Sequence, residues 1–188
     1  MTLTELLIAS ALVGIVTLGL VAAEQAVRTS RVSSSSDSQL SAKLQATMIQ
    51  LSRDASQTVG DANDTGIWQF SSANDNTVCF RQAAGDPNSY SDDPWFCWWA
   101  DKLTGNLWSC GNLLDQHTSC QGLPANQKHL WGTLSDTNFY SLVNNSQGQI
   151  DHIQLNLVSR YDTTKAVHPI TNPDYTLSAE INPPGLSR

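Results

Sequence analysis

Charge is scarce in this chain of 188 residues, because Asp, Glu, Lys and Arg together make up only 14% of it. A surface poor in charge and rich in Ser, Thr, Asn and Gln is typical of extracellular proteins. The net charge is −7, and no basic stripe offsets it. The composition therefore argues against nucleic acid as a partner.

Catalytic motifs are also missing. The sequence contains no HExxH, GxSxG, P-loop or GxGxxG pattern. The four histidines are scattered along the chain: His117, His129, His152 and His168. The stretch from Asp61 to Gly66 resembles the start of a calcium loop, but Ser72 stands where the closing Glu would be. We therefore predict no enzyme, no cofactor and no metal site.

Four cysteines lie in the middle of the chain: Cys79, Cys97, Cys110 and Cys120. An even number behind an export-type N-terminus indicates two disulfides, and four cysteines allow three connectivities. Pairing Cys79 with Cys97 and Cys110 with Cys120 is favoured, because each bond closes a short local loop. No pair has the CxxC spacing of a zinc knuckle, so a zinc site is disfavoured.

The segment from Met1 to Ala23 contains a single ionisable side chain, Glu5. Its uncharged run, Leu6 to Ala23, is near the lower limit of about 17–25 residues for a membrane-spanning helix. A bare carboxylate in hydrocarbon costs about 2.5–3.5 kcal/mol, so Glu5 needs a partner, and a free α-amino group is the nearest candidate.

A signal peptide would have a basic residue before its apolar run. Here Arg28 and Arg31 follow the run and none precedes it. If Met1 is the free N-terminus, the run is expected to be what remains after a basic leader has been removed.

Helical periodicity continues beyond the apolar run, since Leu40, Leu44, Met48 and Leu51 recur at spacings of three and four. We predict one helix from about Thr2 to Ser56. Its residues 1–23 would form a transmembrane or filament-core segment, and its residues 24–59 would be amphipathic. Residues 60–188 would form the globular domain.

The globular part has a strand-and-loop texture. Strands are predicted at Gly66–Phe70, Thr77–Phe80, Gln149–Arg160 and Tyr175–Ile181. The last two are expected to pair antiparallel and to pack on the helix. The predicted fold class is α+β, with a long N-terminal α-helix packed on an antiparallel β-sheet domain with disulfide-linked loops.

Tryptophans are concentrated in the globular part, in the run Trp95-Phe96-Cys97-Trp98-Trp99 and further on at Trp108 and Trp131. They could form a stacking surface for sugars or for a neighbouring subunit. The favoured interpretation is filler for a small disulfide-linked core. Asn63 and Asn144 begin sequons, which makes them possible glycosylation sites.

The N-terminal sequence Met1-Thr2-Leu3-Thr4-Glu5-Leu6-Leu7-Ile8-Ala9 resembles the mature N-terminus of type IV pilins and type II secretion pseudopilins. More weakly, the stretch from Lys43 to Ser56, with its Leu51-x-Arg53-Asp54 sequence, resembles the helix of larger and often minor pilins. The resemblance covers about the first 30 residues strongly, and nothing in the globular part is diagnostic.

The resemblance implies cleavage by prepilin peptidase, N-methylation of Met1 and residence in the inner membrane before assembly machinery builds an extracellular filament. It also implies that Glu5 pairs with the N-terminal amine of an adjacent subunit. Such a pair makes the buried carboxylate tolerable, because an unpaired buried charge costs about 3–5 kcal/mol. A carboxylate favoured by the helix dipole near the helix start is the alternative.

The chain departs from the family pattern at two points. Ala22 stands where many pilins have a proline, and Gly14 and Gly19 lie nearby. Glycine weakens a helix, and the resemblance implies loss of helicity here in assembled pilins, so we expect extended or frayed backbone around Gly14–Gly19 in a filament. Close helix packing is the alternative explanation. The last cysteine is Cys120, so the C-terminal disulfide loop of many pilins is absent.

Three functions follow from the sequence. The first is a structural pilus subunit, in a homo-oligomeric filament or one shared with other pilins. The second is a minor pilin or pseudopilin that primes or tips a filament. The third is a membrane-anchored carbohydrate-binding domain. The sequence does not distinguish among cell adhesion, motility, DNA uptake and secretion.

Overall fold

The computed structural model describes residues 3–60, 66–84, 90, 92–113, 120–169 and 172–183. Side chains are not described at residues 3–16, 26, 28–36 and 121. The chain divides into two compact units, Met1–Gln39 and Leu40–Arg188. Helix α1, Leu3–Ser56, contributes residues to both units.

The last turns of α1 carry the apolar stripe that joins the core. Leu44, Met48, Leu51 and Ala55 are buried, and their spacing of four, three and four residues places them on one helix face. At the C-terminal end of α1, the last backbone carbonyls have no N–H donor within the helix, and a side chain supplies one. The Thr58 hydroxyl donates to the Ala55 carbonyl at 2.8 Å, and this bond occupies a carbonyl that the helix leaves free.

The larger of the two sheets is an antiparallel meander in the order β1-β2-β3-β4-β5. Its strands are β1 Ile67–Ser71, β2 Asp75–Arg81, β3 Trp95–Asp101, β4 Asn106–Leu113 and β5 Lys128–Thr133. Between β3 and β4, Gly105 has a φ of +73°, and a side chain there would clash with the carbonyl oxygen of Leu134. Two short 3-10 helices, η1 Cys120–Gly122 and η2 Ala125–Gln127, precede β5.

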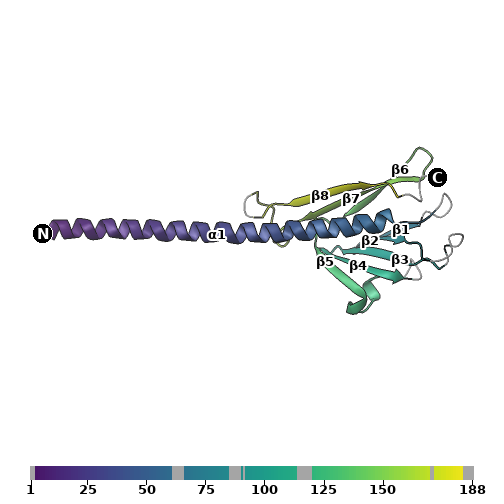
Figure 1. The fold of residues 1–188 in the computed structure, drawn as a ribbon, viewed down its shortest axis with the longest axis horizontal. Helices are drawn as coiled ribbons and strands as arrows, with labels where there is room; N and C mark the ends of the chain where they lie inside the picture. Colours follow the sequence, from purple (N-terminus) through teal and green to yellow (C-terminus); the bar gives the residue numbers. More distant parts are fainter. Residues whose placement is uncertain are drawn as a thin grey trace. The chain divides into compact units, whose positions relative to one another are not determined.

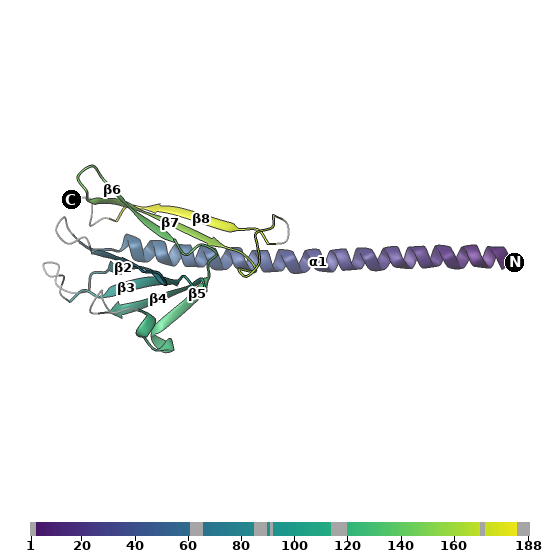
Figure 2. The ribbon, with the colours of Figure 1, turned by 180° about the vertical axis from the view of Figure 1, so that it is seen from behind.

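The smaller sheet has the order β6-β7-β8 and is also antiparallel. Its strands are β6 Tyr140–Asn144, β7 Ile150–Ser159 and β8 Tyr175–Ile181. Within the unit Leu40–Arg188, the end of α1 runs between the two sheets in both views (Figures 1 and 2). The teal sheet lies on one side of it and the green and yellow sheet on the other.

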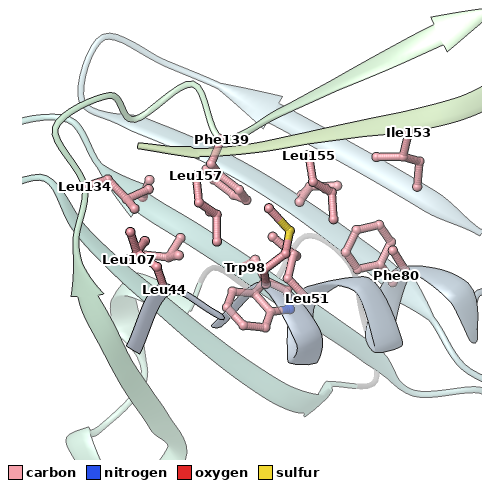
Figure 3. Close-up of a cluster of buried hydrophobic side chains, with 14 residues drawn as sticks. Leu44, Leu51, Phe80, Trp98, Leu107, Leu134, Phe139, Ile153, Leu155 and Leu157 are labelled. Carbon is pink, nitrogen blue, oxygen red and sulfur yellow. The ribbon is translucent and has the colours of Figure 1, made fainter. Parts of the chain in front are cut away.

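The main core is shared by the helix and both sheets. Figure 3 shows side chains from the three layers converging, with Leu51 from α1, Trp98 from β3 and Leu155 from β7 among them. All three are almost completely buried. An apolar helix stripe and two apolar sheet faces thereby cover one another.

A second cluster lies on the opposite face of the larger sheet. Successive residues of a strand point to opposite faces, so β3 sends Trp98 and Ala100 to the main core and Cys97 and Trp99 to the second cluster. Both faces of β3 are therefore covered.

The predicted fold class is wrong in its β part. Among its described residues, the unit Leu40–Arg188 is dominated by strands, which form two antiparallel sheets instead of one. The first disulfide joins neighbouring strands of a sheet and not loops, because Cys79 in β2 and Cys97 in β3 are register partners. Strand β3 was not predicted, because Trp95–Asp101 has no alternation of apolar and polar residues when both of its faces are buried.

Four of the individual strands were predicted correctly, namely β1, β2, β7 and β8. The antiparallel pairing of the last two is also confirmed, with Leu157 opposite Leu177. Partly buried residues of β8 pack against the main core, which includes the buried face of α1.

The apolar stripe of α1 can be tested with two substitutions on the same helix. Leu51→Ala should lower the free energy of unfolding by about 2–5 kcal/mol, because Leu51 is 0% exposed and its loss leaves a cavity. Ile49→Ala should change it by less than about 0.5 kcal/mol, since Ile49 is 70% exposed. Urea denaturation followed by tryptophan fluorescence measures both. Equal losses for the two variants would contradict the assigned helix face.

Candidate functional site

The predicted assembly residues lie at the start of the chain, where the structure describes least. Met1 lies outside the described residues, and so does the sequon residue Asn63. Glu5 and Gly14 fall within α1, but their side chains are not described. The roles given to Met1 and Glu5 remain predictions.

Gly19 lies in helical backbone, and nothing is within 4 Å of the position where its Cβ would be. Among the described atoms of this unit, no close contact explains the glycine. The prediction of extended backbone around Gly14–Gly19 concerns an assembled filament, and it stays a prediction.

The described part of the unit Met1–Gln39 exposes large apolar side chains on α1. Leu18 is 73% exposed, Leu20 71%, Val21 52% and Val27 51%. At 100° per residue, Leu20 and Val27 point about 160–200° away from Leu18, so these side chains lie on opposite sides of the helix. We call these four residues the apolar helix surface. Large apolar side chains exposed on opposite sides of a helix need cover from lipid or protein.

A buried carboxylate connects α1 to the larger sheet. Asp54 is only 6% exposed, and its Oδ2 accepts a hydrogen bond of 2.9 Å from Nε1 of Trp98 in β3. Its Oδ1 accepts a second bond, of 2.8 Å, from Nε2 of Gln50 one helical turn earlier. Burial raises the pKa of the Asp54 carboxyl, and the bonds from Trp98 and Gln50 partly oppose the shift.

The sequence assigned Asp54 no role beyond its place in the Leu-x-Arg-Asp resemblance. The sequence feature that could have indicated a buried role for Asp54 is its position three residues after Leu51, on the border of an apolar stripe. A charged residue at such a position is rarely buried without partners. The structure explains Asp54 as an attachment point for the indole of Trp98.

The favoured disulfide connectivity is confirmed, with bonds Cys79–Cys97 and Cys110–Cys120. The Sγ atoms of Cys97, Cys110 and Cys120 all lie within 4.8 Å of one another. Each is bonded in a disulfide, so none supplies the thiolate that a soft metal ion needs.

The tryptophans serve mainly as interior residues. Trp95, Trp98 and Trp99 are at most 7% exposed. Trp95 and Trp99 pack in the second cluster, with partly buried Trp68 and Trp108 beside them. This agrees with the favoured interpretation of filler for a disulfide-linked core.

One aromatic pair is more accessible. Trp68 and Phe70, two residues apart on strand β1, have ring centroids 5.9 Å apart and nearly parallel planes. Phe70 is 47% exposed. This Trp68–Phe70 pair is the aromatic surface that bears on the alternative of a carbohydrate-binding domain.

The sequon residue Asn144 ends strand β6 and is exposed. Beside it, the Asn145 side-chain oxygen accepts bonds from the backbone amides of Gln147 and Gln149, which shapes the turn into β7. Asn144 is therefore accessible for modification, and modification itself stays a prediction.

No family model matches the chain, and neither the curated proteins nor the solved structures include a significant match. Within the described residues, no helix combines the length and the apolar character needed to cross a membrane.

The titration of Asp54 gives a test of the buried attachment. Its pKa is raised above the ordinary value of 3.8, so the folded state binds this proton more tightly than the unfolded state. The contribution of Asp54 to the free energy of unfolding is complete below about pH 3.8, and it is lost as the pH rises through the raised pKa. The free energy of unfolding of the wild type minus that of Asp54→Asn should therefore fall over this range and then level off.

Asp101 provides a control of opposite sign. The Thr104 hydroxyl, which donates to its carboxylate at 2.6 Å, lowers the pKa of Asp101. The contribution of Asp101 is present above its ordinary pKa and is lost as pH falls, so the difference for Asp101→Asn should rise with pH. Urea denaturation at a series of pH values measures both. A flat or rising difference for Asp54→Asn would contradict the assignment.

Proposed function

We propose that the chain is a structural subunit of an extracellular type IV pilus filament that assembles by packing of its N-terminal helices. The observation that carries the proposal is the apolar helix surface on α1, at Leu18, Leu20, Val21 and Val27. Side chains on opposite sides of one helix can all be covered if several neighbouring helices surround it. A bundle of identical helices in a filament core provides that environment.

The N-terminal motif supports the same proposal. Glu5 is the only ionisable residue between Met1 and Ala23. In a filament, its carboxylate would pair with the N-terminal amine of an adjacent subunit. The pair would fix the axial register of the helices, because a displaced neighbour would leave both charges buried and unpaired.

The proposal also gives the location and the partners. Before assembly, the apolar segment Met1–Ala23 would reside in the inner membrane, where prepilin peptidase and the assembly machinery act. After assembly, the β-rich unit would face the exterior of the cell. Its two disulfides fit that oxidising location.

A minor pilin or pseudopilin is the second candidate. The same helix and motif suit it, and the Leu-x-Arg-Asp sequence at Leu51–Asp54 favours it. Abundance distinguishes the two candidates, since a major subunit dominates the filament and a minor one is a small fraction of it.

The experiment that tests the proposal is mass spectrometry of filaments sheared from the surface of cells that express the full chain. We expect this chain as the main component, with a methylated Met1. Its presence as a trace component would favour the minor-pilin candidate. Its absence from filaments, with all of the chain retained in the membrane fraction, would contradict both and favour the membrane-anchored carbohydrate-binding domain.

Glu5→Ala should abolish normal filaments or the N-methylation of Met1, because the neighbouring amine would lose its buried partner. Electron microscopy of sheared material and the mass of the N-terminal peptide measure the two effects. A Glu5→Gln variant keeps the size and the polarity of the side chain but not its charge. It should fail in the same way, and normal methylated filaments from it would overturn the ion-pair role.

The apolar helix surface is tested by Leu18→Ser and Leu20→Ser, both of which should lower the yield of sheared filaments at least tenfold, a loss of about 1.4 kcal/mol in assembly. The matched control is Leu103→Ser in the turn between β3 and β4. Leu103 is 79% exposed, comparable to Leu18 and Leu20, but it belongs to the β-rich unit. Equal yields from all three variants would show that α1 is not the assembly surface.

A further inference from the structure

Three of the four cysteines occupy one row across the larger sheet. Cys79 in β2 is the register partner of Cys97 in β3, and Cys97 is in turn the register partner of Cys110 in β4. Register partners in antiparallel strands point to the same face. Cys97 therefore has a cysteine beside it on both neighbouring strands.

The fourth cysteine also approaches Cys97. Its Sγ lies 3.7 Å from the Cys97 carbonyl oxygen, and it is held there by the bond from Cys120 to Cys110. The Sγ atoms of Cys97, Cys110 and Cys120 lie within 4.8 Å of one another. Both disulfides are thus parts of one buried sulfur cluster.

We propose that the four cysteines form a single disulfide-exchange centre in which Cys97 can bond to Cys79, Cys110 or Cys120 without a change of strand register. Register partners in an antiparallel pair have Cα atoms about 4.5–5.5 Å apart, and a disulfide accepts separations of about 4.4–6.8 Å. A Cys97–Cys110 bond therefore fits the sheet as it stands.

The exchange step conserves electrons. When Cys97 is a free thiol, it loses its proton, and the thiolate attacks the Sγ of Cys120 in the Cys110–Cys120 bond. The Cys97–Cys120 bond forms as the Cys110–Cys120 bond breaks, and the Cys110 sulfur leaves with the electron pair and takes up a proton. Attack on the Sγ of Cys110 releases Cys120 in the same way. Neither route consumes an oxidant.

A free Cys97 arises while the chain is being oxidised, after the Cys110–Cys120 bond has formed and before the second bond closes. The reverse step corrects a mispaired bond inside a folded sheet: when Cys97 is bonded to Cys110 or Cys120, the free thiolate of the other one attacks its partner, and Cys97 leaves as a thiolate that can then bond to Cys79. The two disulfides reach their final pairing without unfolding of the second cluster. This inference does not depend on the proposed filament.

Two single variants test the exchange. Full-length Cys79→Ser, held at about pH 8.5 where a cysteine thiol is half ionised, is quenched with acid and alkylated with N-ethylmaleimide in denaturant. Peptide mass spectrometry then locates the free thiol. We expect it to be distributed over Cys97, Cys110 and Cys120. A thiol found only at Cys97 would overturn the proposal.

The matched control is Cys97→Ser, which removes the shared residue and leaves Cys79 as the free thiol. Cys79 in β2 and Cys110 in β4 are separated by strand β3, so their backbones lie about 9.6 Å apart, which is twice the spacing of neighbouring strands. Its thiol should therefore stay at Cys79, and a thiol spread over Cys110 and Cys120 in this variant would contradict the central role of Cys97.

A pair of double variants tests the geometry when exchange is not possible. Cys79→Ser/Cys120→Ser keeps Cys97 and Cys110, and oxidised glutathione should convert both thiols to a disulfide with release of two glutathione thiols. Cys97→Ser/Cys120→Ser keeps Cys79 and Cys110, which are too far apart to bond. Circular dichroism establishes that each variant is folded. Free thiols in the first variant or a disulfide in the second would refute the proposal.

Discussion

Burial of one face of α1 between two β-sheets is the interaction on which the rest of the β-rich unit depends. The stripe of Leu44, Met48, Leu51 and Ala55 fills the space between the inner faces of the sheets. Without it, both sheets would expose apolar side chains to water, at about 25 cal/mol for each Å². The bond from Trp98 to Asp54 fixes the helix at one position along β3, since displacement would leave a buried carboxylate without its donor.

That arrangement explains why the disulfides lie where they do. The inner face of the larger sheet packs on α1, and its apolar outer face is covered in part by the short helix η1, whose Cys120 lies in the second cluster. Trp95, Trp99 and the four cysteines fill this face. One disulfide joins β2 to β3 and the other joins β4 to η1, and both stabilise this outer face because they limit the conformations of the unfolded chain. The same crowding places Cys97 between two register partners.

The sequence allowed some of these features to be predicted and not others. The stripe on α1 and the alternation in β7 and β8 are periodic patterns within one segment, and such patterns are readable. Strand β3 has no pattern because both of its faces are buried. The contact of Asp54 with Trp98 joins residues 44 positions apart, and the second sheet depends on long-range pairing. The assembly role of Glu5 rests on the N-terminal motif alone.

An exposed apolar helix and a β-rich unit with two disulfides suit the proposed filament subunit. Its helix would be covered by neighbouring helices, and its β-rich unit would face the exterior of the cell. Helical reconstruction by cryo-electron microscopy, on filaments from cells expressing the full chain, tests this claim most directly. The account predicts α1 helices packed in the filament core, with Leu18 and Leu20 between neighbours and the Glu5 carboxylate within about 4 Å of an adjacent N-terminal amine. Filaments whose core contains no α1 of this chain would contradict it.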